Sequence, residues 1–313
     1  MEPTPPGYTA LHESAAWFDL SGRGKIRVTG RDRVRLLHNM LSNEVRRLAP
    51  GQGNYHFLLN PQGRIQADAN LYLSADFILL DCEPERTERI IEHLRKYIIA
   101  DQVELENITA ALATLAVEGP KAEQMTGFSI PAEPNSHIDQ DGATVARTSA
   151  TGQPGFWLFI DPARKNVWVS RLEKAGAVAA TADEVRLARV ENGVPRYGED
   201  FGETTLPQET QQVRALCFTK GCYLGQEIVE RIRARGQVNK LAVRLGIEGR
   251  QPPEPGAPIL AGAQEIGRLS SPVYSPRLGQ CLGMGILRRE FAGPEAAVTV
   301  GQRAARVLAT PPR

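Results

Sequence analysis

The segment Lys220–Glu227 reads K-G-C-Y-L-G-Q-E and places Cys222 between two glycines. Glycine removes the side chain that would shield a neighbouring sulfur and permits backbone angles that other residues avoid, so the spacing predicts a thiol presented on a tight turn. The ammonium group of Lys220 would favour the thiolate, which is the form that acts as a nucleophile or binds a metal. Most free cysteines are small buried residues, so the residue types alone leave a structural role for Cys222 open beside a chemical one.

The other cysteines and the histidines give no complete metal site. Four cysteines in 313 residues are too few for a disulfide scaffold, and this number is typical of a protein in a reducing cytosol. The five histidines include no pair at ligand spacing, no C-x-x-C occurs, and Cys217 with Cys222 supplies only two thiols. The sequence therefore predicts no metal bound by protein ligands alone.

Asp68 is a second candidate for chemistry. The runs Tyr55–Leu59 and Ile65–Leu73, joined by the turn Asn60–Gly63, predict a β-hairpin. Alternation along the second strand puts the apolar residues on one face, and Asp68 lies on the other face with polar neighbours such as Asn70. That polar face lies either against solvent, the commoner case for a single aspartate, or in a polar cleft.

These candidates must be held by a framework in which short strands alternate with amphipathic helices, an α+β pattern. Lys25–Thr29 predicts a strand, and Thr29–Asp32 resembles a capping box that opens a helix. Helices are also predicted after Pro84, over Pro162–Ala175, and after a second capping box at Thr181–Glu184.

From about Leu241 the pattern changes to short apolar runs that are broken by glycine and proline, which predicts a small all-β domain. These runs are Leu241–Ile247, Gly256–Leu260, Gly267–Leu269, Gly279–Leu287 and Ala297–Val300. We place the boundary near Val238, so the predicted domains are residues 1–237 and 238–313.

Composition and local motifs exclude several classes of function. The chain is 42% hydrophobic and 23% charged with a net charge of +1, which is typical of a globular protein without a general attraction to nucleic acid or membrane. The first residues do not resemble a signal peptide and no stretch approaches the ~20 apolar residues of a membrane helix, so we expect a cytoplasmic protein with no membrane partner. Ser21–Lys25 lacks the spacing of a phosphate-binding loop, and no G-x-S-x-G supports a hydrolase.

The segment Lys220–Glu227 resembles the signature of the YgfZ family of folate-binding proteins, bacterial relatives of the mitochondrial factors that help iron–sulfur proteins to mature. Nearly the whole chain is similar, in the same order, to the superfamily of glycine-cleavage aminomethyltransferases, or T-proteins. The similar segments are Gly24–Gly30, Tyr55–Asp68, Arg189–Asp200, Gly267–Pro276 and Gly279–Gly283.

The resemblance implies a T-protein-like α+β fold, in which a bilobed folate-binding region and a small C-terminal β-barrel surround a central cleft. It also implies tetrahydrofolate or a derivative as cofactor. Tyr55, Asp68 and Trp157 would form the pocket, because aromatic rings and a carboxylate suit stacking on and hydrogen bonding to a planar heterocycle. Asp68 would hold the folate through its pterin or its bridging nitrogen.

The implied function is support of the assembly or repair of iron–sulfur proteins, including enzymes that thiolate tRNA, and the implied partners are those proteins or their assembly machinery. Cys222 would be the working residue, with Lys220, Gln226 and Glu227 shaping its turn. The resemblance leaves open whether the sulfur handles a cluster, a one-carbon adduct or an oxidised form. We do not expect such a factor to be a conventional turnover enzyme, and if it is an enzyme, the resemblance implies a folate-dependent one-carbon transferase.

Departures from the T-protein pattern argue against aminomethyl transfer. Ala67 precedes Asp68 where a T-protein has an acid pair, Trp157 replaces a glutamate, and Val185 replaces an arginine. Neutral Trp157 and Val185 cannot hold polar folate groups as glutamate and arginine would. A folate-dependent aminomethyltransferase or demethylase, with Asp68 as general base, stays the alternative.

A third interpretation is a binding module that docks RNA on one basic run, which contains Arg231, Arg233, Arg235, Lys240 and Arg244. The run lacks the interleaved aromatic residues on which single-stranded bases stack. The same arginines could bind the acidic tail of a polyglutamated folate or face water, so we do not expect direct RNA binding.

Overall fold

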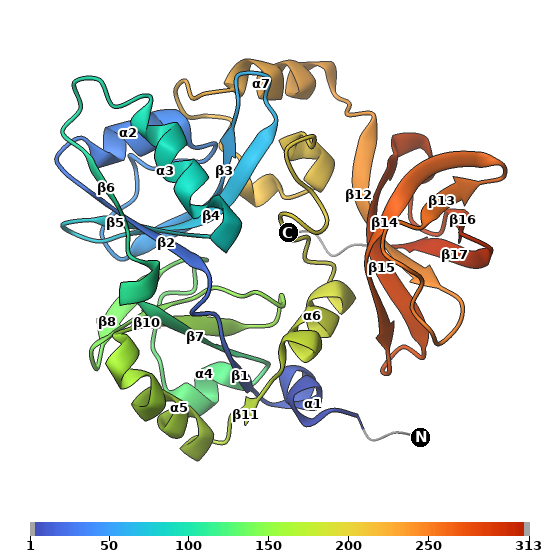
Figure 1. Ribbon diagram of the computed structural model, residues 1–313, viewed down its shortest axis with the longest axis horizontal. Coiled ribbons are helices and arrows are strands. Elements are labelled where there is room, and N and C mark those ends of the chain that lie inside the picture. The colour runs from blue at the N-terminus through green and yellow to red at the C-terminus, as the bar shows by residue number, and fades with distance from the viewer. Residues whose placement is uncertain (1–3, 310–313) are drawn as a thin grey trace.

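The computed structural model describes residues 4–309, apart from the side chain of Arg235. Within this range the chain forms two sheet-and-helix lobes and a separate barrel (Figure 1). The α+β prediction is confirmed. No helix in the described part of the chain is long and apolar enough to cross a membrane.

The first lobe is a five-stranded antiparallel sheet with the order β3-β4-β5-β2-β6. Helices α2 and α3 pack on one of its faces through buried residues such as Leu37 and Ile90. The elements are β2 (Gly24–Thr29), α2 (Arg33–Met40), β3 (Gln52–Leu59), β4 (Ile65–Leu73), β5 (Ile78–Cys82), α3 (Thr87–Arg95) and β6 (Glu104–Asn107).

The predicted hairpin is confirmed as β3 and β4, with Phe57 opposite Asp68 in the register. The capping box predicted at Thr29–Asp32 is wrong, because the Asp32 side chain caps no helical N–H. Its carboxylate accepts instead from the backbone N–H of Gln102, at 2.9 Å, and so ties the start of α2 to a distant loop.

The second lobe is a six-stranded sheet with the order β11-β1-β7-β10-β9-β8, in which only β1 and β11 run parallel. Helices α4 and α5 cover one face, where Trp168 packs on the strands. The elements are α1 (Pro6–Glu13), β1 (Ala16–Asp19), β7 (Ala113–Glu118), α4 (Ala122–Thr126), β8 (His137–Gln140), β9 (Ala143–Ala146), β10 (Gly155–Ile160), α5 (Lys165–Lys174) and β11 (Val178–Ala179).

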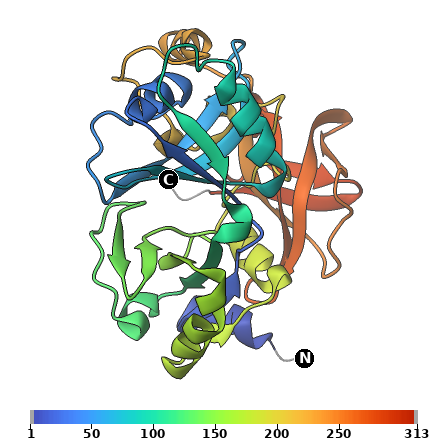
Figure 2. The same cartoon turned by 60° about the vertical axis from the view of Figure 1, so that its left-hand side comes forward.

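The helix-free faces of the two sheets meet each other. Tyr72 and Leu79 of the first sheet share one buried cluster with Phe18, Trp157 and Phe159 of the second. Figure 2 shows the two lobes stacked one above the other, with the barrel at their side. Asp68 lies on the same face of β4 as Tyr72, so its side chain points between the two sheets. Of the two locations that the sequence left open, the polar face of β4 therefore lines a cleft and does not face solvent.

Helix α6 (Ala182–Glu191) leads from the second lobe back toward the first. Its predicted capping box is confirmed: the Thr181 backbone N–H donates to Glu184 Oε2 at 2.7 Å, and the Glu184 N–H donates to Thr181 Oγ1 at 3.3 Å. After a long irregular stretch, α7 (Gln226–Arg235) connects to the barrel. Short 3-10 turns occur at Pro84–Arg86, Thr109–Ala111, Pro162–Arg164, Pro207–Thr210, Val213–Ala215 and Arg289–Phe291.

The C-terminal strands close into a barrel with the order β12-β15-β14-β13-β16-β17. They are β12 (Lys240–Ile247), β13 (Pro258–Ala261), β14 (Gln264–Ser275), β15 (Gln280–Arg288), β16 (Ala297–Val300) and β17 (Arg303–Leu308). The sequence pattern located the first five and missed β17, whose alternation R-A-A-R-V-L contains few large apolar residues. The division at residues 237 and 238 stays a prediction.

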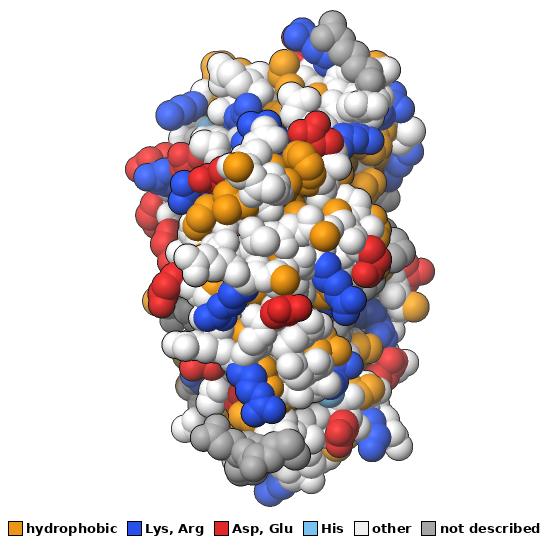
Figure 3. All heavy atoms as spheres, turned by 90° about the vertical axis from the view of Figure 1, so that its right-hand side faces the viewer, with side chains coloured by type: hydrophobic (Ala, Val, Ile, Leu, Met, Phe, Trp, Pro, Cys, Tyr) orange, Lys and Arg blue, Asp and Glu red, His pale blue; other side chains and the backbone are white. Residues whose placement is uncertain are grey.

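The barrel side of the molecule carries no single-sign surface. On the face shown in Figure 3, lysine and arginine side chains are interspersed with aspartate and glutamate. Part of the basic run is also neutralised, because Arg231 pairs with Glu227 at 2.6 Å and Arg233 with Glu230 at 2.8 Å. This arrangement gives RNA no continuous basic platform there.

Candidate functional site

A cavity of about 360 Å³ lies between the two sheets and is bounded by α6 and by the segment that follows it. Tyr55, Asp68 and Trp157, predicted from sequence to share a pocket, all line this cavity. Val185 also lines it and gives the wall an apolar surface. The structure thus brings together residues that are more than a hundred positions apart in the chain.

Tyr55 and Asp68 form a hydrogen-bonded pair across the β3–β4 hairpin. The Tyr55 hydroxyl donates to Asp68 Oδ2 at 2.6 Å. The other carboxyl oxygen, Oδ1, is buried and has no hydrogen-bond partner within the described residues. Burial raises the pKa of Asp68 to about 6, although the bond from Tyr55 acts in the opposite direction. The cavity therefore contains a carboxyl group that ionises near neutral pH and has one free acceptor oxygen.

Trp157 and Tyr55 present less ring surface than the sequence suggested. Trp157 is only 2% exposed, and its indole N–H donates to Glu118 Oε1 at 3.1 Å. The guanidinium carbon of Arg23 lies 5.1 Å from the Trp157 ring centroid, and that of Arg214 lies 4.8 Å from the Tyr55 ring centroid. A planar ligand therefore has at most the opposite face of each ring available, and stacking stays a prediction.

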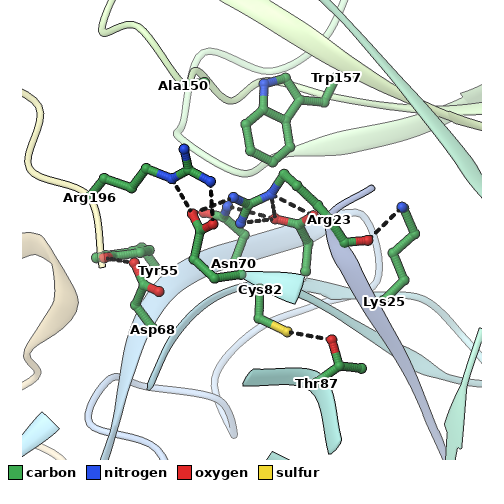
Figure 4. Close-up of polar contacts among 12 residues, drawn as sticks. Arg23, Lys25, Tyr55, Asp68, Asn70, Cys82, Thr87, Ala150, Trp157 and Arg196 are labelled. Atoms are coloured by element: carbon green, nitrogen blue, oxygen red, sulfur yellow. Dashed lines mark hydrogen bonds and ion pairs between the residues drawn. The ribbon is translucent and has the colours of Figure 1, made fainter. Parts of the chain in front are cut away.

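A network of charged side chains, centred on buried Asp81 and Glu83, forms the floor of the cavity, and its members share no local motif in the sequence. The Arg23 guanidinium donates to Asp81 at 2.8 to 3.0 Å and to Glu83 at 2.9 Å. Arg196 holds the other Glu83 oxygen at 2.6 Å. Figure 4 shows this network between Trp157, which comes from the second sheet, and the Tyr55–Asp68 pair of the first.

The segment that resembled a phosphate loop supplies part of this network. Lys25 is buried, and its ammonium group donates to the backbone oxygens of Ser21 and Arg23, both at 2.8 Å. The lysine thus fixes the turn that presents Arg23 to the cavity. A useful signal in the sequence was Asn70, which shares the polar face of β4 with Asp68 and donates to Asp81 at 3.3 Å.

Cys222 lies in a different hollow. It is exposed, and it lines an open depression of about 430 Å³ together with His38, Asn39, Arg46, Gly221 and Tyr223. The structure therefore separates the predicted thiol site from the predicted folate pocket. Cys82 and Cys281 are buried. Burial raises the pKa of the Cys82 thiol to about 12 and also raises that of Cys281.

Lys220 anchors the thiol segment to the end of α2. Its ammonium group donates to the backbone oxygens of His38 and Leu41 at 2.6 Å and of Asn43 at 2.7 Å. The carbonyls of His38 and Leu41 belong to the end of α2, where a helix leaves carbonyls without an intrahelical partner, and that of Asn43 belongs to the loop that follows. Burial lowers the pKa of Lys220 to about 8. The lysine thus holds the loop in place, whereas an effect of its charge on Cys222 stays a prediction.

The rest of the motif builds the turn. Gln226 Oε1 accepts from the Tyr223 backbone N–H at 3.2 Å. Gly225 has φ +81°, and a Cβ there would lie 2.6 Å from the carbonyl oxygen of Asn60, so only glycine allows this close approach to the hairpin turn. Glu227 points outward on the first turn of α7 and pairs with Arg231. Gln226 therefore begins α7 and bonds back to the turn through its side chain, while Glu227 lies on the exposed side of the helix, and a role for either residue in the function of Cys222 stays a prediction.

One residue connects the two sites. The Asn43 side chain donates to the backbone oxygen of Tyr55 at 3.0 Å and to that of Arg214 at 2.8 Å. The Asn43 backbone oxygen in turn accepts from Lys220. The hairpin that carries Tyr55 is thus tied to the loop that carries Cys222.

Comparison with known proteins identifies the class. Residues 7–220 match the GCVT N-terminal domain, and residues 240–312 match the glycine cleavage T-protein C-terminal barrel domain. The chain therefore belongs to the GCVT family, the aminomethyltransferase-type superfamily. An aminomethyltransferase of Rubrobacter xylanophilus is 31% identical over 301 residues, which cover 92% of this chain and 81% of the relative. An aminomethyltransferase of a Geobacillus species is 29% identical over 97% of this chain and 88% of its own length.

A solved structure confirms the T-protein-like fold. The glycine cleavage system aminomethyltransferase T from Bartonella henselae superposes with a TM-score of 0.88 at 20% sequence identity. The match covers 98% of this chain and 88% of that one. The fold prediction, with two lobes and a C-terminal barrel, is thereby confirmed.

Proposed function

We propose that the protein binds a reduced folate, tetrahydrofolate or a derivative, in the cavity between the two sheets. The observation that carries this proposal is the free Oδ1 oxygen of Asp68, which is buried without a partner in the described chain. A buried acceptor of this kind is costly unless a ligand supplies the missing donor. The pterin ring and the bridging nitrogen of a reduced folate both carry N–H groups that could donate a hydrogen bond to Asp68.

The surroundings of Asp68 also fit such a ligand. A volume of about 360 Å³ is within the range of small-molecule pockets, roughly 300 to 1,000 Å³. Val185 and Trp157 give apolar wall, while the exposed Arg214 and the half-exposed Arg196 supply positive charge for an acidic tail. Bound folate would supply a one-carbon carrier, and the protein would supply binding and orientation.

We further propose that the protein is a cytoplasmic factor for the assembly or repair of iron–sulfur proteins, including enzymes that thiolate tRNA, and not an aminomethyltransferase. Two features support this proposal. The K-G-C-Y-L-G-Q-E segment presents Cys222 at the surface, where a protein partner can reach it. Neutral Trp157 and Val185 stand in the cavity where the T-protein pattern has charged residues.

Calorimetry with tetrahydrofolate tests the pocket. We expect saturable heat with a Kd weaker than nanomolar, because Trp157 and Val185 offer fewer polar contacts than glutamate and arginine would. Asp68→Ala should weaken binding at least tenfold, and Asp76→Ala, at an exposed aspartate on the β4–β5 turn, should leave it unchanged. No heat at millimolar ligand from folded wild-type protein would reject the pocket assignment.

The second candidate is a folate-dependent aminomethyltransferase, and the names of the relatives favour it. The raised pKa of Asp68, about 6, would suit a general base near neutral pH. The distinguishing assay is tetrahydrofolate-dependent ammonia release from aminomethylated carrier protein. Steady turnover at ordinary enzyme rates would select this second function over the first.

Complementation tests the role of the thiol. Cys222→Ser keeps the shape of an exposed side chain but removes the sulfur nucleophile. We expect the variant to fold, to keep its folate affinity, and to fail to restore iron–sulfur enzyme activity in cells that lack the protein. Full activity at native expression would contradict a working Cys222.

A further inference from the structure

Beside Cys222 the structure places a histidine that the sequence did not single out. His38 lies in the last turn of α2, and its side chain is 4% exposed. It lines the same hollow as Cys222. A Cβ built on Gly221 would lie 4.0 Å from His38 Nε2, so this ring nitrogen faces the backbone that carries the thiol. The glycine before the cysteine keeps that approach open.

A carboxylate lies beside the imidazole. Glu44 Oε1 is 3.1 Å from His38 Nδ1, which is an ion-pair distance, although the two atoms lie outside hydrogen-bond geometry. The same oxygen accepts from the backbone N–H groups of Arg46 at 2.8 Å and Arg47 at 3.3 Å, so the backbone holds the carboxylate in place. A histidine whose Nδ1 faces a carboxylate keeps its proton there and leaves Nε2 as an acceptor.

The charges around His38 favour its neutral form. Burial lowers the pKa of His38, the Lys220 ammonium and Arg46 lower it further, and Glu44 acts in the opposite direction. His56 lies behind this group and has a pKa well below its usual value, because it is buried. At neutral pH His38 is therefore able to take a proton.

The hollow also contains a cation. Arg46 lines it with an exposed side chain, and the guanidinium has no ion-pair partner among the described residues. A free guanidinium beside a thiol favours ligands with a carboxylate or a similar anionic group.

We propose that Cys222, His38 and Glu44 act as nucleophile, base and orienting carboxylate, and that Arg46 selects small electrophiles that carry a carboxylate. The proposal rests on the proposed function only in taking Cys222 as the working thiol. With iodoacetate as the probe, the Cys222 sulfur forms a bond to the methylene carbon. The carbon–iodine bond breaks, iodide leaves with the electron pair, and the thiol proton passes to His38 Nε2.

Alkylation of the full chain by iodoacetate and by neutral iodoacetamide, followed by mass spectrometry, tests both the base and the selectivity for a carboxylate. All variants carry Cys217→Ser, so that Cys222 is the only cysteine not buried. His38→Gln should slow the alkylation of Cys222 by both reagents about tenfold near pH 7. Near pH 10 its alkylation rate should match that of the parent, because the thiolate forms there without a base. Glu44→Gln should give a smaller loss with the same pH dependence.

Arg46→Gln should slow iodoacetate about tenfold relative to iodoacetamide, and this selectivity should shrink in high salt. Arg47→Gln is the matched control, because Arg47 belongs to the same turn, is 76% exposed at its side chain, and does not line the hollow. The ratio of the two rates should be unchanged in that variant.

Equal alkylation rates for His38→Gln and its parent from pH 6 to 10 would overturn the assignment of His38 as the base. An unchanged ratio of the iodoacetate rate to the iodoacetamide rate in Arg46→Gln would overturn the role of Arg46 in selectivity. Should His38→Gln fail to fold, His38→Asn replaces it, and the same slowing near pH 7 is expected. Because no folate is present in this assay, the expected alkylation pattern together with full complementation by Cys222→Ser would reject only the proposed function.

Discussion

Asp68 should make the protein less stable at neutral pH than an uncharged residue would. Its pKa is raised from 3.8 to about 6, chiefly by burial. The folded state therefore binds more protons than the unfolded state between these two values, and stability falls as pH rises through that window. Since a difference of one pKa unit corresponds to 1.36 kcal/mol, the unfolding free energy lost above about pH 6 is about 3 kcal/mol.

Asp68→Asn tests this argument, because asparagine can accept the Tyr55 hydrogen bond but cannot ionise. From about pH 4 to about pH 7.5, the unfolding free energy of the variant relative to wild type should rise by about 2.5 kcal/mol, measured by urea denaturation at both pH values. Comparing two pH values cancels any constant difference in shape between the two side chains. Asp76→Asn, at an exposed position, is the control and should show no such pH-dependent gain.

A difference in unfolding free energy between Asp68→Asn and wild type that does not change with pH would refute the electrostatic argument, and so would a difference that moves against the variant as pH rises. If the predicted gain appears together with weaker folate binding, the carboxylate costs stability and serves the ligand. Such a trade-off is common where a binding site must keep a desolvated charge.

Three further predictions concern the framework. Gly225→Ala should lower the unfolding free energy by about 2 kcal/mol more than Gly236→Ala does, as measured by urea denaturation. Both glycines have φ +81°, but only a Cβ at position 225 would lie 2.6 Å from the carbonyl oxygen of Asn60, so equal losses would contradict this argument. Lys220→Met should cost about 3 kcal/mol or more by leaving three carbonyls without their donor, and a neutral effect would show that water replaces the ammonium. Thr181→Ala should cost about 1 kcal/mol by removing one half of the α6 capping box, with the midpoint of thermal unfolding as the measurement.

Elements with local signals could be predicted from the sequence. The hairpin follows from strict alternation around Asn60–Gly63, and α6 follows from the reciprocal Thr181 and Glu184 pair. The box at Thr29 failed because its second partner, Asp32, bonds to Gln102, 70 residues away. Long-range contacts of that kind leave no trace in local spacing.

Within the two candidate sites, too, residues with a local sequence signal could be predicted, and those that depend on long-range contacts could not. Asp68 could be assigned to a polar face from period-two alternation, but whether that face met solvent or a cleft depended on the packing of the second sheet. Arg23 and Glu83 meet only because β2 and β5 are paired. His38 was passed over because histidine ligand spacing was sought along the chain, whereas its partner Glu44 lies on a turn beyond the end of α2.

The thiol motif supports the chemical role that we propose for Cys222. Lys220 ties the segment to α2, Tyr223 is buried in a core cluster, and Gly225 allows the turn to approach the hairpin. Gln226 completes the turn through its bond to the Tyr223 backbone. Each of these residues has a structural task, but Cys222 contributes to no core cluster and is exposed. Because packing gives no reason for a cysteine at that position, the turn is better explained as a support for the sulfur than the sulfur as a support for the turn.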